Sequence, residues 1–192
     1  AGTGRQQPSI RGVNAIGIGG ATVGYYIDEA PLPANGGSLR LTNMDPSLYD
    51  LDRVEVLRGP QGTLYGSGSM GGTIKIVPNR PALGFTEAAA RLKGEAVDGG
   101  DGLIDAAAMI NFPIAPGRLG MRTTGWIRTG GGFIDRYAGD RKVADVPDEE
   151  TFGFRSSLAW EPSSRFRADA SVFHQQQRFN GFQSVTFEGA NP

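Results

Sequence analysis

Hydrophobic and polar residues alternate along five segments in the second half of the chain, at residues 86–96, 103–114, 119–129, 151–161 and 165–173. In residues 103–114, one side carries Ile104, Ala106, Ala108, Ile110 and Phe112, and the other side carries Asp105 and Asn111. A period of two is typical of β-strands, because successive side chains point to opposite faces of a sheet. The pattern therefore predicts five consecutive antiparallel strands in up-and-down order.

The predicted strands are long, at about ten to thirteen residues, whereas strands of globular proteins usually have about 5–6. A strand that crosses a bilayer needs about 9–11 tilted residues. The connections include short turns, "APGR" and "EPSS", and one long, glycine-rich, charged loop, "GGGFIDRYAGDRKVADVPDEE". Outer-membrane barrels combine short periplasmic turns with longer external loops. A soluble β-sandwich, whose strands also alternate, is the alternative.

Residues 1–81 have a different pattern and predict a small mixed α/β domain. Three short β-like runs, Val23–Ile27, Arg53–Arg58 and Thr73–Val77, stand between loops rich in glycine, proline and asparagine. The segment "NMDPSLYDLDR" favours a short helix, with Asp45 as the N-cap and Pro46 at the first helical position. We therefore place a domain boundary at Pro81, between domain 1–81 and strand region 82–192.

A glycine-rich stretch near this boundary contains the pattern G-x-G-x-x-G at Gly66, Gly68 and Gly71. A dinucleotide-binding loop of this kind requires a helix directly after the glycines, whose N-terminus holds the pyrophosphate. Here the glycines precede "GTIKIVP", which alternates and therefore predicts a strand. The P-loop pattern also fails, because Gly72 is followed by Thr73. We interpret these glycines as structural, at tight turns.

Composition narrows the function further. The net charge of −1 gives no electrostatic footprint for nucleic acid. The chain has no cysteine and a single histidine, His174, which argues against a cysteine- or histidine-based metal site and against a catalytic triad. An enzyme built on the glycine loop would lack a base, a nucleophile and a metal cluster, so we expect neither catalytic residues nor a cofactor.

The segment "DRVEVLRGPQGTLYGSGSMGGTIKIVPNRP" resembles the signature near the end of the plug domain in TonB-dependent outer-membrane receptors. Upstream, "SIRGV" resembles the IRG element of the plug, and "VGYYIDEAPL" resembles its Y-x-D-G-x-x-L strand. Glu29 and Ala30 depart from that last pattern, because the family commonly has glycine at the first of these positions. The motifs cover about residues 8–81, and the strand pattern extends the resemblance to about 178.

The resemblance implies a membrane β-barrel with an α/β plug, in a family whose barrels have about 22 strands. Five strands cannot close such a barrel. The chain also begins at "AGTGRQQPSIRG", without an initiator methionine. We therefore expect a partial plug, lacking its N-terminal part, followed by about five antiparallel transmembrane strands of an incomplete barrel.

The function implied by the resemblance is active uptake of a scarce, bulky nutrient across the outer membrane of a Gram-negative bacterium. The expected partners are the energy-transducing TonB–ExbB–ExbD complex, reached through a TonB box outside this chain, outer-membrane lipid, and an extracellular ligand, most often a ferric siderophore. Haem, cobalamin and carbohydrate ligands stay open. A passive porin or a structural barrel is the alternative, although a porin would lack the plug.

Candidate site residues also follow from the family motifs. The plug loops that face outward in the family correspond to residues 14–20 and 33–38, so we expect ligand contacts from Asn14, Ile16, Ile18 and Asn35. Ordinary glycine-rich turns are the alternative.

Family plug arginines pair with barrel carboxylates, and the corresponding residues are Arg11 and Arg58, with Glu55 as a local partner. Exposure to water in the lumen is the alternative for both arginines. On the barrel side, we expect four charged residues to face the plug: Glu87, Arg91, Lys93 and Glu95.

Overall fold

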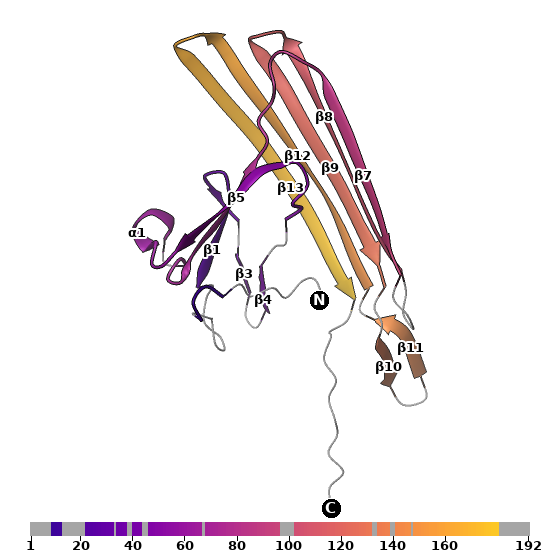
Figure 1. The fold of residues 1–192 in the computed structure, drawn as a ribbon. Coiled ribbons are helices and arrows are strands. Elements are labelled where there is room, and N and C mark those ends of the chain that lie inside the picture. Colours follow the sequence, from indigo (N-terminus) through magenta and orange to yellow (C-terminus); the bar gives the residue numbers. More distant parts are fainter. Residues whose placement is uncertain are drawn as a thin grey trace, which may run out of the picture.

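The computed structural model of the chain consists of a sheet of long strands and a smaller group of short strands beside it (Figure 1). It describes residues 9–12, 22–32, 34–37, 40–43, 46–66, 68–96, 102–131, 134–138, 141–146 and 148–180. For residues 34–37, 40–43, 134–138, 141–146, 148 and 179–180 only the backbone is described. No helix in these ranges is long and apolar enough to cross a membrane.

The long strands form one five-stranded sheet, called the wall below, in the spatial order β13-β12-β9-β8-β7. Their bounds are β7 Glu87–Glu95, β8 Leu103–Ala115, β9 Leu119–Gly130, β12 Asp148–Ser163 and β13 Phe166–Asn180. All four neighbouring pairs are antiparallel. This confirms the five predicted strands and their up-and-down order. The sheet is open, because β7 and β13 do not pair with each other among the described residues.

A hairpin inside the long loop was not predicted. It consists of β10 (Ile134–Ala138) and β11 (Arg141–Val146), which pair with each other between β9 and β12. Figure 1 shows this hairpin at the end of the wall opposite the β8–β9 and β12–β13 turns. The structure therefore has short turns at one end of the wall and a long insertion at the other, as the loop lengths predicted.

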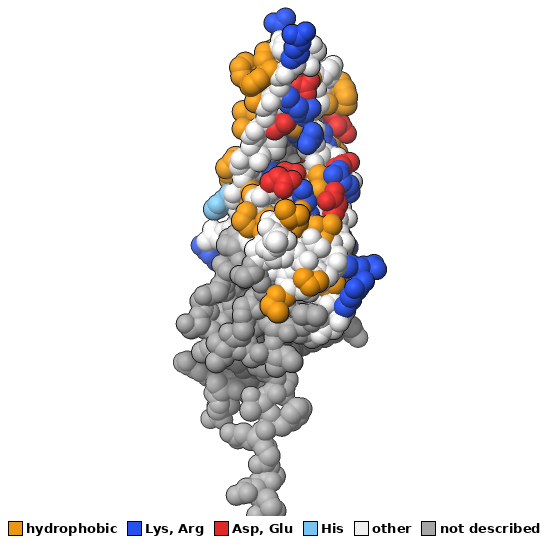
Figure 2. All heavy atoms as spheres, turned by 90° about the vertical axis from the view of Figure 1, so that its left-hand side faces the viewer, with side chains coloured by type: hydrophobic (Ala, Val, Ile, Leu, Met, Phe, Trp, Pro, Cys, Tyr) orange, Lys and Arg blue, Asp and Glu red, His pale blue; other side chains and the backbone are white. Residues whose placement is uncertain are grey.

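The two faces of the wall differ in the way that the alternation predicted. One face, called the inner face below, lies toward the short N-terminal strands and buries polar side chains, among them Asn111, Arg122, Thr124 and Arg155. The opposite face exposes large apolar side chains: Ile104, Ile110, Ile127, Phe152, Leu158, Trp160, Phe166 and Val172. Figure 2 shows basic and acidic side chains intermingled on one face of the molecule, with hydrophobic side chains along its margins.

The other short strands lie in the N-terminal part of the chain, which we call the plug after the resemblance described above. One mixed sheet has the order β2-β1-β6-β5, with β1 Val23–Ile27, β2 Ala30–Pro31, β5 Leu51–Arg58 and β6 Gly72–Pro78. Strands β1 and β6 are parallel, and the other pairs are antiparallel. A separate pair is formed by β3 (Ala34–Gly37) and β4 (Arg40–Asn43). The buried apolar residues of this part include Ile10, Val23, Ile27, Ile76 and Val77.

The helix predicted over "NMDPSLYDLDR" is wrong. Residues 46–48 have no regular structure, residues 49–50 form a turn, and β5 begins at Leu51. The Ser47 hydroxyl accepts a hydrogen bond from the Tyr49 backbone N–H at 3.3 Å, a local side-chain contact that competes with helix formation. Asp50 then adopts a left-handed backbone conformation, with φ of 61°, which a helix cannot contain.

The structural interpretation of the glycine-rich stretch is confirmed. The segment holds one short helix, α1 (Gly62–Tyr65), which was not predicted, and the backbone leaves it at Gly66 with φ of 75°. Gly72 has φ of 150°, and a Cβ atom there would lie 2.4 Å from the carbonyl oxygen of Leu57. The chain then continues as strand β6 and not as the helix that a dinucleotide site requires.

Candidate functional site between the plug and the wall

The linker between β6 and β7 is held against the wall by Asn111 of β8. Asn111 is fully buried, and its Nδ2 donates to the carbonyl oxygens of Ala82, at 3.2 Å, and Phe85, at 2.8 Å. Its Oδ1 accepts from the Ala82 backbone N–H at 2.9 Å. The carbonyl oxygen of Leu83 accepts from the Gly117 N–H at 2.8 Å. These contacts are neutral, and they fix the linker over the inner face of β8 and the β8–β9 turn.

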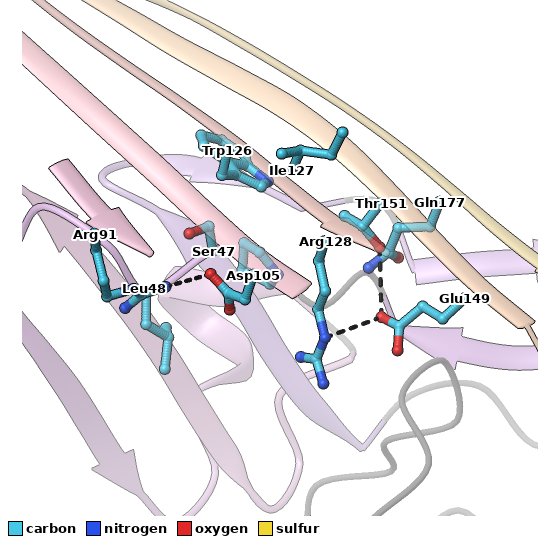
Figure 3. A pocket seen from close by; sticks show the side chains of 11 residues that line it. Ser47, Leu48, Arg91, Asp105, Trp126, Ile127, Arg128, Glu149, Thr151 and Gln177 are labelled. Atoms are coloured by element: carbon cyan, nitrogen blue, oxygen red, sulfur yellow. Dashed lines mark hydrogen bonds and ion pairs between the residues drawn. The ribbon is translucent and has the colours of Figure 1, made fainter. Parts of the chain in front are cut away.

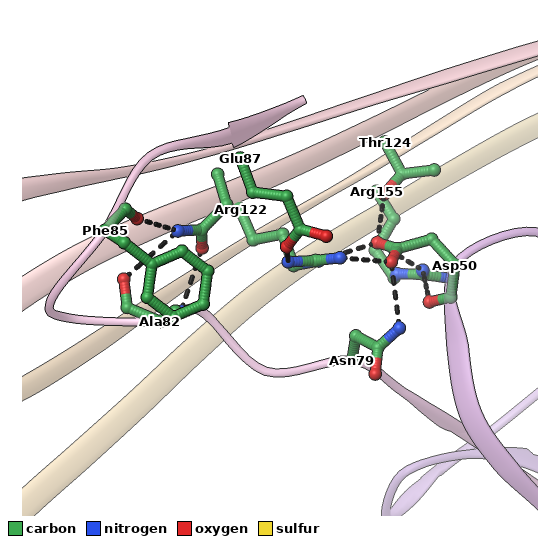
Figure 4. Close-up of polar contacts among 9 residues, drawn as sticks. Asp50, Asn79, Ala82, Phe85, Glu87, Arg122, Thr124 and Arg155 are labelled. Atoms are coloured by element: carbon green, nitrogen blue, oxygen red, sulfur yellow. Dashed lines mark hydrogen bonds and ion pairs between the residues drawn. The ribbon is translucent and has the colours of Figure 1, made fainter. Parts of the chain in front are cut away.

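A second set of contacts joins the plug itself to the wall through Asp50, the residue before β5 (Figure 4). Arg122 of β9 binds both carboxylate oxygens of Asp50, with Nε at 2.8 Å from Oδ2 and Nη2 at 2.5 Å from Oδ1. Thr124, on the same face of β9, donates to Oδ2 at 2.8 Å. Asn79 of the plug side donates to Oδ1 at 2.9 Å. We call Asp50, Asn79, Arg122, Thr124 and Arg155 the Asp50 cluster.

Arg155 adds a second arginine from the wall, on β12. Its Nη2 donates to the Asp50 carbonyl oxygen at 2.9 Å and lies 3.7 Å from Oδ2 of the same residue. The side chains of Asp50, Arg122 and Arg155 are 4%, 8% and 5% exposed, respectively. Removing one partner of so buried a charge pair is costly, because the other charge is left desolvated.

The environment of Asp50 favours its charged form. Burial alone would raise its pKa, but hydrogen bonds from Arg122, Asn79 and Thr124 oppose burial and hold the pKa of the Asp50 carboxyl below its ordinary value. The plug therefore presents a stable carboxylate to two arginines of the wall at neutral pH.

Glu87, the first residue of β7, is the wall's own partner for Arg122. Its Oε2 accepts from Arg122 Nη1 at 3.1 Å, and its side chain is 45% exposed. Arg122 thus bridges a carboxylate of the plug and a carboxylate of the wall. Glu87 was predicted to face the plug, and its contact with an inward-facing arginine agrees with that prediction.

A pocket of about 220 Å³ adjoins this cluster, between plug residues 46–48 and the inner face of the wall (Figure 3). Its charged lining consists of Arg91, Asp105, Arg128 and Glu149. Arg91 binds Asp105 at 2.9 Å, and Arg128 lies 3.7 Å from Glu149. The paired charges of opposite sign give the pocket no net preference for an anion or a cation. Among the described residues no group of three or more His, Asp and Glu could hold a metal ion.

Most of the predicted ligand residues lie outside the described residues. Asn14, Ile16 and Ile18 lie outside the described residues, and Asn35 lies in β3 with only its backbone described. Their contact with a ligand stays a prediction.

The predicted plug–barrel contacts also stay predictions. Arg11 and Arg58 are exposed, and neither forms an ion pair with a described residue. Glu55 binds Arg53, at 2.7 Å, and neither of the two arginines. In the part of the chain that the structure describes, the ion pairs between plug and wall run through Asp50. Their polarity is the reverse of the expected one, because the plug supplies the carboxylate and the wall supplies the arginines.

The sequence of this chain is similar to those of TonB-dependent receptors. The family model of the TonB-dependent receptor plug domain matches residues 1–73. The ferrioxamine receptor of Yersinia enterocolitica is 28% identical over 168 residues, which cover 82% of this chain and 22% of that receptor. The pesticin receptor of the same species is 42% identical over 74 residues, which cover 38% of this chain and 10% of that receptor.

A solved structure with the same fold is the siderophore receptor PirA of Acinetobacter baumannii. It superimposes with a TM-score of 0.65 at 18% identity, over 93% of this chain and 28% of PirA. This chain therefore spans about a quarter or less of the length of the proteins it matches. The similarity to the ferrioxamine receptor covers too much of this chain to be confined to the plug, and includes part of the wall.

Proposed function

Because residues 1–73 match the plug domain of TonB-dependent receptors and the similarity to the ferrioxamine receptor extends into the wall, we propose that this chain is part of a TonB-dependent receptor of the Gram-negative outer membrane that actively imports a ferric siderophore. The observation that carries the proposal is the packing of a plug against the polar inner face of a wall whose outer face is apolar. In a passive pore, a plug that is bound to the wall by buried ion pairs would block diffusion through the lumen.

The wall has the properties of a membrane-spanning sheet. Its strands β8, β9, β12 and β13 have 13, 12, 16 and 15 residues, and each exceeds the roughly 9–11 residues that a tilted strand needs to cross a bilayer. On the outer face, Trp160 and Phe166 stack edge to face, with ring centroids 5.5 Å apart, next to the β12–β13 turn. Aromatic side chains at strand ends are typical of the interfacial girdles of outer-membrane barrels.

The plug supplies the part that must move. A barrel of this family is wide enough to hold an aqueous channel, so the plug fills the lumen and has to shift or partly unfold before a bulky ligand can pass. Force from the TonB–ExbB–ExbD complex, acting on a segment outside this chain, drives that movement. The family consists of receptors and transporters, and the relatives named above are receptors rather than enzymes.

The ligand class is proposed from the relatives, two of which are named for ferrioxamine or a siderophore. The ligand meets the plug loops at Asn14, Ile16, Ile18 and Asn35. Arg11 and Arg58, with Glu55 nearby, add contacts between the plug and the strands that complete the barrel.

The test is uptake of radioactive iron as ferric ferrioxamine B by cells whose only ferrioxamine receptor is the full-length protein. We expect saturable uptake that disappears in an isogenic strain without TonB. Uptake that rises linearly with concentration and does not need TonB would support a passive porin instead. Haem, cobalamin and an oligosaccharide, each labelled and assayed in parallel, test the other ligand classes.

The plug loops are tested in the same cells. Asn35→Ala should weaken ferrioxamine binding without changing the amount of receptor at the surface. Asp52→Asn is the matched control, because Asp52 is an exposed plug residue that binds its neighbour Arg53. Equal binding by both variants would remove Asn35 from the ligand site.

A further inference from the structure

Two of the three charged groups of the Asp50 cluster, Arg122 and Asp50, have a second partner on their own side of the boundary between plug and wall. The third, Arg155, binds the backbone of Tyr49 and Asp50 in the plug. On the wall, Arg122 donates to Asp50 and also, through Nη1, to Glu87 at 3.1 Å. On the plug, Asp50 accepts from Arg122 and also from Asn79 at 2.9 Å. Separation of plug and wall therefore leaves neither Arg122 nor Asp50 without a hydrogen-bonding partner. This lowers the cost of breaking a buried ion pair, which is otherwise high.

We propose that the Asp50 cluster is the releasable contact between plug and wall: it holds the plug at rest, and it opens during uptake as Arg122 passes from Asp50 to Glu87. This inference rests on the proposed function, because it assigns a role to the cluster in plug movement. It differs from the expected plug–barrel contacts in its residues and in its polarity.

The position of Asp50 in the plug suits this role. Asp50 directly precedes β5, which pairs with β6 along Val54–Arg58, and β6 pairs in turn with β1 along Gly72–Ile76. A displacement of β1 therefore reaches Asp50 through two ladders of backbone hydrogen bonds. The linker contact at Asn111 lies on the other side of that path, next to the start of β7, and does not have to open when the plug sheet moves.

The resting contact is tested with Asp50→Asn in the full-length receptor, expressed in cells without TonB and without siderophore. The neutral amide keeps the shape of the side chain but removes its charge. We expect permeability to vancomycin, which is too large for porins, to rise about a hundred-fold, which corresponds to about 2.8 kcal/mol. Asp52→Asn, which removes an exposed carboxylate two residues away, should not change permeability.

The release step is tested with Glu87→Gln, which removes the charge that receives Arg122 after release. We expect unchanged vancomycin permeability but an uptake rate for ferric ferrioxamine B that is lower by about ten-fold. A purely structural role for Glu87 would change both measurements together, or neither.

Protease accessibility at the cell surface shows that each variant is inserted in the outer membrane. A shift of its electrophoretic mobility on heating shows that it is folded. Permeability of Asp50→Asn equal to that of Asp52→Asn, at equal surface levels, would overturn the proposal. The permeability assay needs neither TonB nor a siderophore, so its result stands even if ferrioxamine is not the ligand. Conversely, loss of ferrioxamine uptake in the unmodified receptor would count against the proposed function alone.

Discussion

The hydrogen bonds of Asn111 and those of Asp50 attach the plug and its linker to the wall with different chemistry. At Asn111, a neutral amide of the wall binds backbone groups of Ala82 and Phe85, in the linker that leads directly into β7. At Asp50, a carboxylate of the plug binds arginines from two strands of the wall. The first attachment joins segments that are covalently close to the wall in any state. The second joins segments 72 and 105 residues apart in the sequence.

The difference shows how one fold can contain a fixed contact and a releasable one. At Asn111, one buried amide makes three hydrogen bonds to the linker backbone, so losing this side chain removes all three together. At the Asp50 cluster, Arg122 has an alternative partner in Glu87, and Asp50 has one in Asn79. We therefore expect changes at Asn111 to affect folding, and changes at Asp50 to affect retention of the plug.

The largest effect is expected from Asn111→Leu. The substitution removes three hydrogen bonds, each worth about 1 kcal/mol, so the free energy of unfolding should fall by about 3 kcal/mol. The measurement is urea unfolding of the full-length receptor in detergent micelles. Ser156→Ala is the control, because Ser156 makes one hydrogen bond on the outer face of the wall, at 2.9 Å to Thr123. A stable Asn111→Leu receptor that leaks vancomycin would mean that Asn111 also retains the plug.

A smaller effect is expected from Arg122→Lys. A lysine has no planar fork, so it cannot bind both oxygens of Asp50 and also reach Glu87. Loss of one charged hydrogen bond should weaken plug retention by about 1.5 kcal/mol. Vancomycin permeability should lie between that of the unmodified receptor and that of Asp50→Asn. Arg178→Lys is the control, because Arg178 of β13 pairs with Glu150 of β12 at 3.7 Å, both side chains are exposed, and a lysine can make the same contact. Permeability as high as that of Asp50→Asn would show that charge alone does not hold the plug.

The sequence predicted the wall far better than it predicted the site. Alternation is a local property, so it identified five strands and their two faces from the residues of each segment alone. It could not identify Asp50 as the partner of Arg122, because that pairing depends on how two distant parts of the chain pack. Asp50 offered a weak signal, as an acidic residue just before a strand, but the segment was interpreted as a helix. The hairpin β10–β11 was missed because its short strands lie in a segment that composition marks as a loop.

The pH dependence of plug retention distinguishes the two attachments further. Arg122 and Arg155 face Asp50 from the wall, Glu87 lies beside Arg122, and the charge of Asp28 in the plug also acts on Arg155. The pKa of Asp50 is lowered in the docked plug, so docking is favoured above the ordinary carboxyl pKa, about 3.9, and is lost as the pH falls through the lowered value.

Vancomycin leakage through the full-length receptor in liposomes should therefore stay constant from neutral pH to about pH 5 and increase only below about 3.9. The Asp50→Asn receptor should leak at every pH in this range. Leakage of the unmodified receptor that begins near pH 6 would contradict the assignment of Asp50 as the titrating group. The Asn111 contact contains no titratable group, so the linker should stay bound throughout.

The smallest effect is expected from Thr124→Val, which keeps the shape of the side chain and removes the one hydrogen bond that its uncharged hydroxyl donates to the Asp50 carboxylate. Thr123→Val is a closely matched control, since Thr123 is the next residue of β9 and its hydroxyl pairs with Ser156 on the outer face, at 2.9 Å. Loss of the inner hydrogen bond should destabilise the docked plug by about 1 kcal/mol. Amides that exchange only when the plug leaves the wall should then exchange about five-fold faster. Hydrogen exchange of peptides that cover residues 46–58, followed by mass spectrometry of the full-length receptor, measures this. Thr123→Val should leave these peptides unchanged, because its hydrogen bond joins two strands of the wall. Equal acceleration in both variants would mean that residues 46–58 respond to the stability of the wall as a whole and not to the Asp50 cluster.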